Sequence, residues 1–237
     1  MKTVLFDLDG TLLPMDMEVF MKTYLHELYL KGMQLGYDGN QLVQVVLAGV
    51  NAMVNNDGTL TNEQRFWRLF IDHFGGEMDE HIEVFEEFYA NEFAKVAKAV
   101  RPTPLANEAV QVLKEKGYEL VLATNPLFPR IATLERMRWA GLQPEDFALI
   151  TTYENSRFAK PNLDYYREIL TTIDARAEEC LMVGNDVAED LIVAQLGIQA
   201  FLVTDDLIHA DGVDYANIPQ GNREEMLAYF LELPKRE

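Results

Sequence analysis

The chain has 237 residues, a formal net charge of −19 and a hydrophobic content of 49%. This length is enough for one large domain or two modest ones, and the apolar content argues against disorder. The negative charge argues against nucleic acid and anionic membranes as partners, because both carry the same sign of charge.

The chain also lacks the sequence features of membrane insertion and export. Its longest apolar runs, such as 120–123 and 200–203, are far shorter than the ~20 residues of a transmembrane helix. The N-terminus enters the run Val-Leu-Phe after three residues, without the apolar region and cleavage site of a signal peptide. Cys180 is the only cysteine, which excludes an internal disulfide. We therefore expect a cytoplasmic protein, with a monomer as the default.

The first predicted element is an apolar strand at residues 3–8, and a helical region follows it. Residues 15–101 contain almost no strand signal, and their apolar residues recur at helical spacing in four stretches. The pattern predicts helices around residues 20–28, 42–53, 61–74 and 82–96. The third begins with Thr-Asn-Glu-Gln, a capping-box sequence. Four amphipathic helices predict a small bundle.

Residues 102–237 alternate between helical patterns and short apolar runs. Strands are predicted at residues 119–125, 147–151, 181–183 and 199–204, with a helical pattern before each. Together with the first strand, this alternation predicts an α/β fold, a doubly wound and mostly parallel sheet with helices on both faces. We expect a core domain formed by 1–14 and 102–237, interrupted by a helical domain at 15–101.

Two carboxylates stand at the end of the first predicted strand. Asp7 and Asp9 are followed by Gly10, which indicates that the chain is already turning. In parallel α/β sheets, ligands bind at the carboxyl ends of the strands. On their own, these residues are also consistent with an ordinary acidic loop that contains a turn glycine. Whether they form an active site therefore depends on segments later in the chain.

Four segments in chain order resemble the motifs of the haloacid dehalogenase-like (HAD) hydrolase superfamily. Residues 7–11, Asp-Leu-Asp-Gly-Thr, are similar to its highly specific first motif. The second motif is matched by Thr124 at the end of a core strand, the third by Lys160 before a proline, and the fourth by residues 184–190. The resemblance covers the whole chain, because residues 15–101 lie where this superfamily places a C1-type helical cap. It implies a Rossmann-like core and phosphatase activity.

The resemblance implies a magnesium-dependent phosphatase that works through an aspartyl-phosphate. Asp7 would be the nucleophile, which divides hydrolysis into two displacements. Asp9 would protonate the leaving group and then activate the water, since one carboxyl group can serve both steps in turn. Mg²⁺ prefers oxygen ligands, and the carboxylates of Asp7 and Asp186 with the backbone carbonyl of Asp9 would supply them.

Polar groups from the second and third motifs are expected to hold the phosphate. Thr124 would donate a hydrogen bond to a phosphate oxygen, and Lys160 would neutralise Asp7 and the phosphate. Asn125 either helps to orient Asp7 or simply forms a turn with Pro126. Taken alone, Thr124 is also typical of a β-branched residue that ends a strand. Lys160 alone is also typical of a surface lysine that precedes a proline.

The fourth motif departs from the family pattern. Asn185 stands directly after the strand-ending glycine, where the family commonly has an acid, and Asp186 comes one residue later. A charged ligand binds a hard dication better than a neutral amide, so we assign the metal to Asp186 and keep Asn185 as the alternative. Asp190 is predicted to orient metal-bound waters or Lys160.

The polar loop at residues 55–58 either projects toward the active site or is a solvated turn. The aromatic residues of the helical region are expected to form the core of the bundle.

The expected substrate is a small phosphorylated metabolite, and sugar phosphates, nucleotides and phosphoglycolate-like acids all fit. A dehalogenase of the same superfamily is disfavoured, because Asp9 supplies an acid that a leaving halide does not need. Phosphonate hydrolysis is disfavoured for the same reason. A sugar-phosphate mutase and a non-catalytic phosphate-binding module remain as alternatives.

Overall fold

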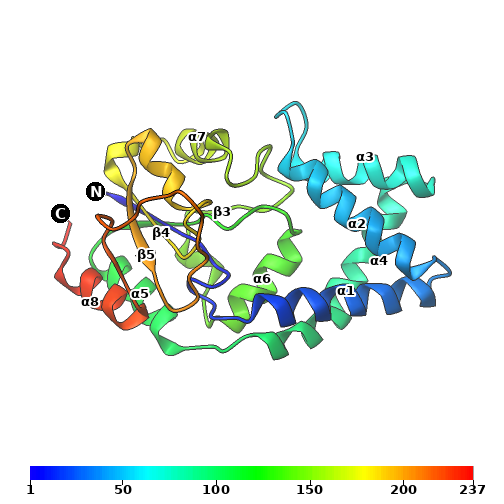
Figure 1. The fold of residues 1–237 in the computed structure, drawn as a ribbon, viewed down its shortest axis with the longest axis horizontal. Coiled ribbons are helices and arrows are strands. Elements are labelled where there is room, and N and C mark those ends of the chain that lie inside the picture. The colour runs from blue at the N-terminus through cyan, green and yellow to red at the C-terminus, as the bar shows by residue number, and fades with distance from the viewer. Residues whose placement is uncertain (237) are drawn as a thin grey trace.

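The computed structural model describes residues 1–236 and shows an elongated molecule (Figure 1). A sheet with its flanking helices forms one end, and the helices within residues 17–99 form the other (Figure 1). The N-terminus and the last helix of the described chain lie at the end away from these helices (Figure 1). Within the described chain, none of the helices combines the length and apolarity needed to cross a bilayer.

All the strand pairs in the sheet are parallel, and β1 lies near its centre. The strand order is β3-β2-β1-β4-β5-β6. The bounds are β1 Thr3–Phe6, β2 Glu119–Leu122, β3 Leu149–Ile150, β4 Cys180–Gly184, β5 Gln199–Val203 and β6 Gln220–Gly221. The predicted α/β fold with a mostly parallel sheet is therefore confirmed.

Helices cover both faces of this sheet because alternate strand residues point to opposite sides. Val4 and Phe6 belong to one buried cluster with α5, α6 and α8, whereas Leu5 belongs to a second cluster with α7 and the 3₁₀ helix η4. The bounds are α5 Pro104–Glu115, α6 Arg130–Trp139, α7 Leu163–Thr172, α8 Arg223–Glu232, η2 Pro144–Asp146, η3 Ala177–Glu179 and η4 Leu191–Leu196.

The helical segment, residues 17–99, contains the four predicted helices: α1 Met17–Gln34, α2 Gly39–Val54, α3 Asn62–Phe74 and α4 Met78–Asn91. The capping box at Thr61 is present in full. The last predicted helix continues beyond α4 as a 3₁₀ helix, η1 Glu92–Ala99. Its buried residues Phe93, Val96 and Ala99 recur every three positions, which matches the 3₁₀ repeat and not the α repeat.

The two connections to the helical segment lie side by side. The amide of Asp16 donates to the carbonyl of Ala99 over 2.8 Å, and the amide of Arg101 donates to the carbonyl of Pro14 over 2.8 Å. The domain division expected at residues 14–15 and 101–102 stays a prediction, and this paired connection lies at those positions.

Candidate active site

Asp7 lies at the carboxyl end of β1 and is held by a buried lysine. Its amide donates to the carbonyl of Val183 on β4, which fixes it at the centre of the sheet edge. The ammonium of Lys160 lies 2.9 Å from Asp7 Oδ1 and 2.7 Å from Asp190 Oδ1. Burial opposes the charge on Lys160, but the carboxylates of Asp190 and Asp7 raise its pKa well above the ordinary value. The structure thus brings the predicted residues Asp7, Lys160 and Asp190 together around one cation.

The turn after Asp7 joins the first motif to the fourth. The hydroxyl of Thr11 lies 3.2 Å from Asp7 Oδ2 and 2.9 Å from Asn185 Oδ1. Gly10 has a positive φ of 82°, and a Cβ there would lie 2.3 Å from Asn185 Nδ2. Only glycine satisfies both conditions without displacing a neighbour. Thr11 was included in the first motif, but its link to Asn185 was not expected.

A buried arginine from outside the four motifs supports this turn. Arg223, the first residue of α8, donates from Nε to the carbonyl of Thr11 over 2.7 Å. Its Nη2 donates to the carbonyl of Gly10 and, over 2.7 Å, to Asp206 Oδ2. The backbone carbonyl of Asp206 in turn accepts from Asn185 Nδ2. Arg223 therefore ties α8 to the active-site turn at Gly10 and Thr11.

Asp9 forms an ion pair with a second buried arginine that sequence analysis did not identify. Arg136 on α6 donates from Nη1 to Asp9 Oδ2, and its side chain is 1% exposed. The other oxygen, Oδ1, is buried and has no partner among the described residues. Burial raises the pKa of Asp9 above its usual range, although the charge of Arg136 acts to lower it. Asp7 and Asp9 thus have different cations and different environments.

The second motif provides one free hydroxyl and one bridging amide. The carbonyl of Thr124 accepts from Thr151 Oγ1 and from the Tyr165 hydroxyl, whereas its own hydroxyl has no hydrogen-bond partner within residues 1–236. Asn125 Oδ1 accepts from the amide of Lys160 over 3.2 Å, and its Nδ2 donates to Glu189 Oε1 over 3.0 Å. Among residues 1–236, the side chain of Asn125 is therefore linked to Asp7 through Lys160 and makes no direct hydrogen bond to it.

The fourth motif folds back on itself through its acids. Asp190 Oδ2 accepts from the amide of Asp186 over 3.0 Å, while Oδ1 binds Lys160 as predicted. Asp186 Oδ1 accepts from the amides of Ala188 and Glu189, so this carboxylate closes the turn with one of its oxygens. In the part of the chain that is described, hydrogen bonds link Asn185 with Asp7 through Thr11, and none links Asp186 with Asp7 directly.

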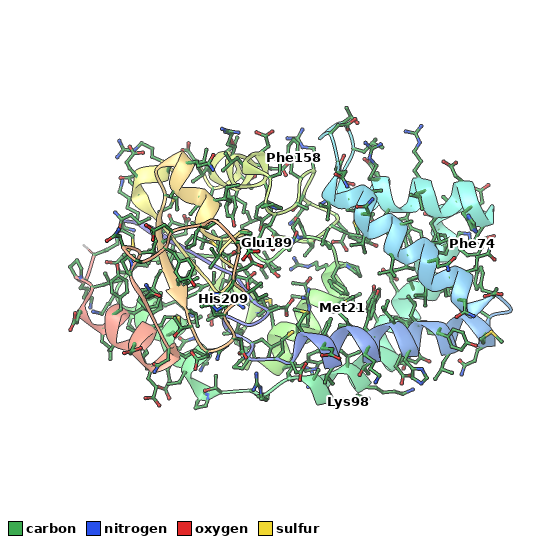
Figure 2. The ribbon with its side chains drawn as sticks, viewed as in Figure 1. Met21, Phe74, Lys98, Phe158, Glu189 and His209 are labelled. Atoms are coloured by element: carbon green, nitrogen blue, oxygen red, sulfur yellow. The ribbon has the colours of Figure 1, made fainter. Side chains whose placement is uncertain are left out.

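The donor chemistry of this edge fits a divalent cation. The carboxylates here outnumber the three buried cations, Lys160, Arg136 and Arg223. Burial raises the pKa of Glu189 to about 7, and the nearby charges of Asp186 and Asp190 add to that effect. Figure 2 shows Glu189 on the side of the sheet that faces the helical segment. Within residues 1–236, no three Asp, Glu, His or Cys side chains are placed to bind one metal ion. The expected ligand set needs only two carboxylates and one backbone carbonyl, so it would not appear as such a group.

The polar loop of the helical segment contacts the core, with Asn56 buried and with Asn55 and Asp57 exposed to solvent. The buried Nδ2 of Asn62 donates to the carbonyls of Pro126 and Phe158 over 3.2 and 3.1 Å, and its Oδ1 accepts from Asn56 Nδ2 over 2.9 Å. Gly58 packs against Phe158, where a Cβ would lie 2.3 Å from the ring. Figure 2 shows Phe158 between the core and this loop. The docking loop, residues 55–62, therefore contacts the chain next to both Asn125 and Lys160.

A cavity of about 420 Å³ lies between the helical segment and the core. On the core side it includes Leu127 and Pro129, which directly follow the second motif. Glu63 and Glu154 also line it. The remaining wall residues are aromatic, aliphatic and charged: Tyr24, Phe66, Trp67, Phe85, Tyr89 and Tyr153, then Val46, Val50, Ile82, Ile131 and Leu134, then Glu86 and Arg130.

A carboxylate at the carboxyl end of a central parallel strand, paired with a buried lysine and followed by a second carboxylate, defines a HAD-type hydrolase site. The family model of the haloacid dehalogenase-like hydrolases matches residues 1–197, and the chain belongs to this family. It is therefore an enzyme, a hydrolase. Arg223 lies beyond the matched region.

The known proteins that resemble this chain differ in their chemistry. A glyceraldehyde 3-phosphate phosphatase of Methanothermobacter thermautotrophicus is 27% identical over 180 residues, which are 69% of this chain and 78% of that protein. A HAD phosphatase structure from Thermococcus onnurineus superposes with a TM-score of 0.61 at 20% identity and covers 100% of both chains. A 2-haloacid dehalogenase from Pseudomonas syringae superposes with a TM-score of 0.62 at 19% identity, over 97% of this chain and 99% of its own. The two structural matches establish the fold alone, so the reaction has to be inferred from the residues of the site.

Proposed function

We propose that the chain is a phosphatase, a phosphoric monoester hydrolase that works through an aspartyl-phosphate on Asp7. The observation that carries the proposal is that the two carboxylates, Asp7 and Asp9, lie in different electrostatic environments. Asp7 is paired with Lys160, and Asp9 is paired separately with Arg136. Two carboxyl groups in different environments can take different roles, one as nucleophile and one as acid and base. The phosphatase activity of the 27% identical relative supports the same reaction.

The chain's own groups account for both displacements. An oxygen of Asp7 attacks phosphorus, and the bond to the leaving oxygen breaks as Asp9 gives that oxygen its proton. A water then attacks phosphorus, Asp9 takes the proton of that water, and the Asp7 carboxylate is released with free phosphate. Lys160 offsets the charge of the nucleophile, and the free hydroxyl of Thr124 is available to a phosphate oxygen.

Mg²⁺ fits the excess of carboxylates at this edge, with Asp7, Asp186 and the carbonyl of Asp9 as proposed ligands. When bound, the metal would lessen the repulsion between the Asp7 carboxylate and a phosphate dianion. Asn185 remains the alternative ligand, because its Oδ1 lies 2.9 Å from the hydroxyl that also contacts Asp7.

Asp9 favours an alcohol over a halide as the leaving group, and therefore a phosphate ester over a haloacid as the substrate. A departing halide needs no proton, whereas an alkoxide does. A partly buried carboxyl group whose pKa is raised by desolvation is suited to supply that proton. The neighbouring cavity has room for the organic part of a small metabolite, so we propose that a small phosphorylated metabolite is the substrate.

The proposal predicts magnesium-dependent hydrolysis of p-nitrophenyl phosphate. Removal of the metal with EDTA should abolish release of nitrophenol, and added Mg²⁺ should restore it. 2-Chloropropionate with halide detection serves as the competing substrate. Halide release without phosphatase activity would refute the proposal. A panel of phosphorylated metabolites then ranks the natural candidates.

The metal ligands can be separated by titrating Mg²⁺ against three variants. Asp186→Ala should raise the Mg²⁺ concentration for half-maximal activity most, because a charged ligand is lost. Asp190→Ala should raise it less and Asn185→Ala least. If Asn185→Ala had the largest effect, Asn185 would replace Asp186 in the ligand set.

Asp9→Asn should harm poor leaving groups far more than good ones. Nitrophenolate needs little protonation, so p-nitrophenyl phosphate should retain some reaction, while phenyl and alkyl phosphates should lose about 10²–10⁴-fold in kcat. The comparison uses kcat for each ester with wild type and variant. Equal losses on all esters would contradict the acid and base role of Asp9.

A further inference from the structure

Arg136 is a buried cation whose only acidic partner among residues 1–236 is Asp9. Its Nη1 donates to Asp9 Oδ2, its Nη2 donates to the hydroxyl of Thr133 over 3.3 Å, and its Nε donates to the carbonyl of Ala132 over 3.4 Å. A buried guanidinium without a counter-charge would be strongly destabilising. Arg136 and Asp9 are therefore each other's electrostatic complement across the edge of the active site.

An aromatic ring holds the guanidinium in place and connects it to the helical segment. The guanidinium carbon of Arg136 lies 4.6 Å from the centre of the Phe128 ring, a cation–π distance. Phe128 also packs edge-to-face with the ring of Tyr24 on α1, with centroids 5.4 Å apart. Tyr24 in turn shares a 2.9 Å hydrogen bond with Tyr89 on α4. The position of Arg136 is thus set by α6, by Phe128 and by the helical segment together.

We propose that Arg136 is a positioning residue for leaving-group protonation: it holds Asp9 and stabilises the carboxylate that Asp9 becomes. In the first displacement the proton of Asp9 passes to the leaving oxygen, and the electron pair of that O–H bond stays on Asp9 as negative charge. The Arg136 guanidinium faces that charge at hydrogen-bond distance in a buried site, where charge-assisted bonds are strongest. In the second displacement the same pairing orients the carboxylate that takes the proton of water. This inference rests on the proposed phosphatase function.

The test measures the ratio of kcat/KM for p-nitrophenyl phosphate to that for phenyl phosphate. Both esters carry the same phosphoryl group and differ in how much protonation their leaving group needs. Arg136→Met should raise the ratio about tenfold or more, because only phenolate departure depends strongly on Asp9. Arg136→Lys keeps the charge and should give a ratio closer to wild type. Because the ratio is taken within one sample, a smaller folded fraction cancels from it.

Arg138→Met is the matched control, because Arg138 lies on the same helix but is exposed and pairs with Glu135. It should leave the ratio unchanged. In an Asp9→Asn background, Arg136→Met should change the ratio by less than about twofold. Arg136 acts through the Asp9 carboxyl group, so the effects of the two substitutions should not add.

An unchanged ratio in Arg136→Met would overturn the inference, as would an equal shift in the Asp9→Asn background. A lysine variant as defective as the methionine variant would overturn the role of the charge. Absence of activity on both esters in the wild type would instead refute the proposed function, so the two failures are distinguishable.

Discussion

Replacing Asp7 with asparagine is expected to lower turnover of p-nitrophenyl phosphate by about four to six orders of magnitude, the scale seen for loss of a catalytic nucleophile. Asparagine preserves the shape of the side chain and can still accept a hydrogen bond from Lys160 through its remaining oxygen, but it removes the attacking charge. The loss should appear in kcat, with the fold intact by circular dichroism.

Rapid quenching and mass spectrometry give an independent readout of the same step. The wild type should carry a phosphoryl group on the peptide containing Asp7, and the variant should carry none. Asp211→Asn, an exposed aspartate in the described chain, is the control for loss of one negative charge. Near-normal turnover in Asp7→Asn would mean that the reaction does not pass through this residue.

Lys160→Met should have the second-largest effect, on activity and on stability together. The lysine is fully buried between Asp7 and Asp190, so its removal leaves two carboxylates facing each other without a cation. Breaking a buried pair by removing one partner costs about 3–5 kcal/mol, and urea unfolding measures this cost. Activity should fall to background, because the nucleophile and the phosphate would repel each other without Lys160.

Two further variants separate the structural from the catalytic part of this loss. Arg167→Met removes one partner of an exposed pair with Asp164 and should cost less than about 1 kcal/mol. Lys160→Met combined with Asp190→Asn removes one unpaired charge and should recover stability without recovering activity. Recovery of both would reduce Lys160 to a structural ion-pair partner.

The spacing of apolar residues predicted most of the fold, because the helices and strands near the site have clear apolar patterns. The strands around Leu5 and Val121 are short apolar runs, and the capping box at Thr61 marks the start of α3. Two elements at the end of the chain were not predicted. β6 has only two residues, and α8 carries few buried residues, among them Met226 and Phe230, so neither presents a clear pattern.

The predicted site residues follow strand ends, and a parallel sheet gathers such residues at one edge. This is why Asp7, Lys160 and Asp190 could be predicted to meet although they are far apart in sequence. Arg136 and Arg223 could not be predicted in the same way. Both lie within helices, and an arginine there is ordinarily solvent-exposed. Only the packing of α6 and α8 against the first motif makes them buried partners of it.

The docking of Asn62 has a consequence for how easily the two parts of the molecule can separate. One amide group serves two core carbonyls, so lifting α3 would release the chain beside Asn125 and the chain beside Lys160 in the same event. Water would at once replace the lost partners, so each hydrogen bond contributes only about 0.5–1.5 kcal/mol net. Such a contact fixes the register of the docked state at a small net free energy for each hydrogen bond.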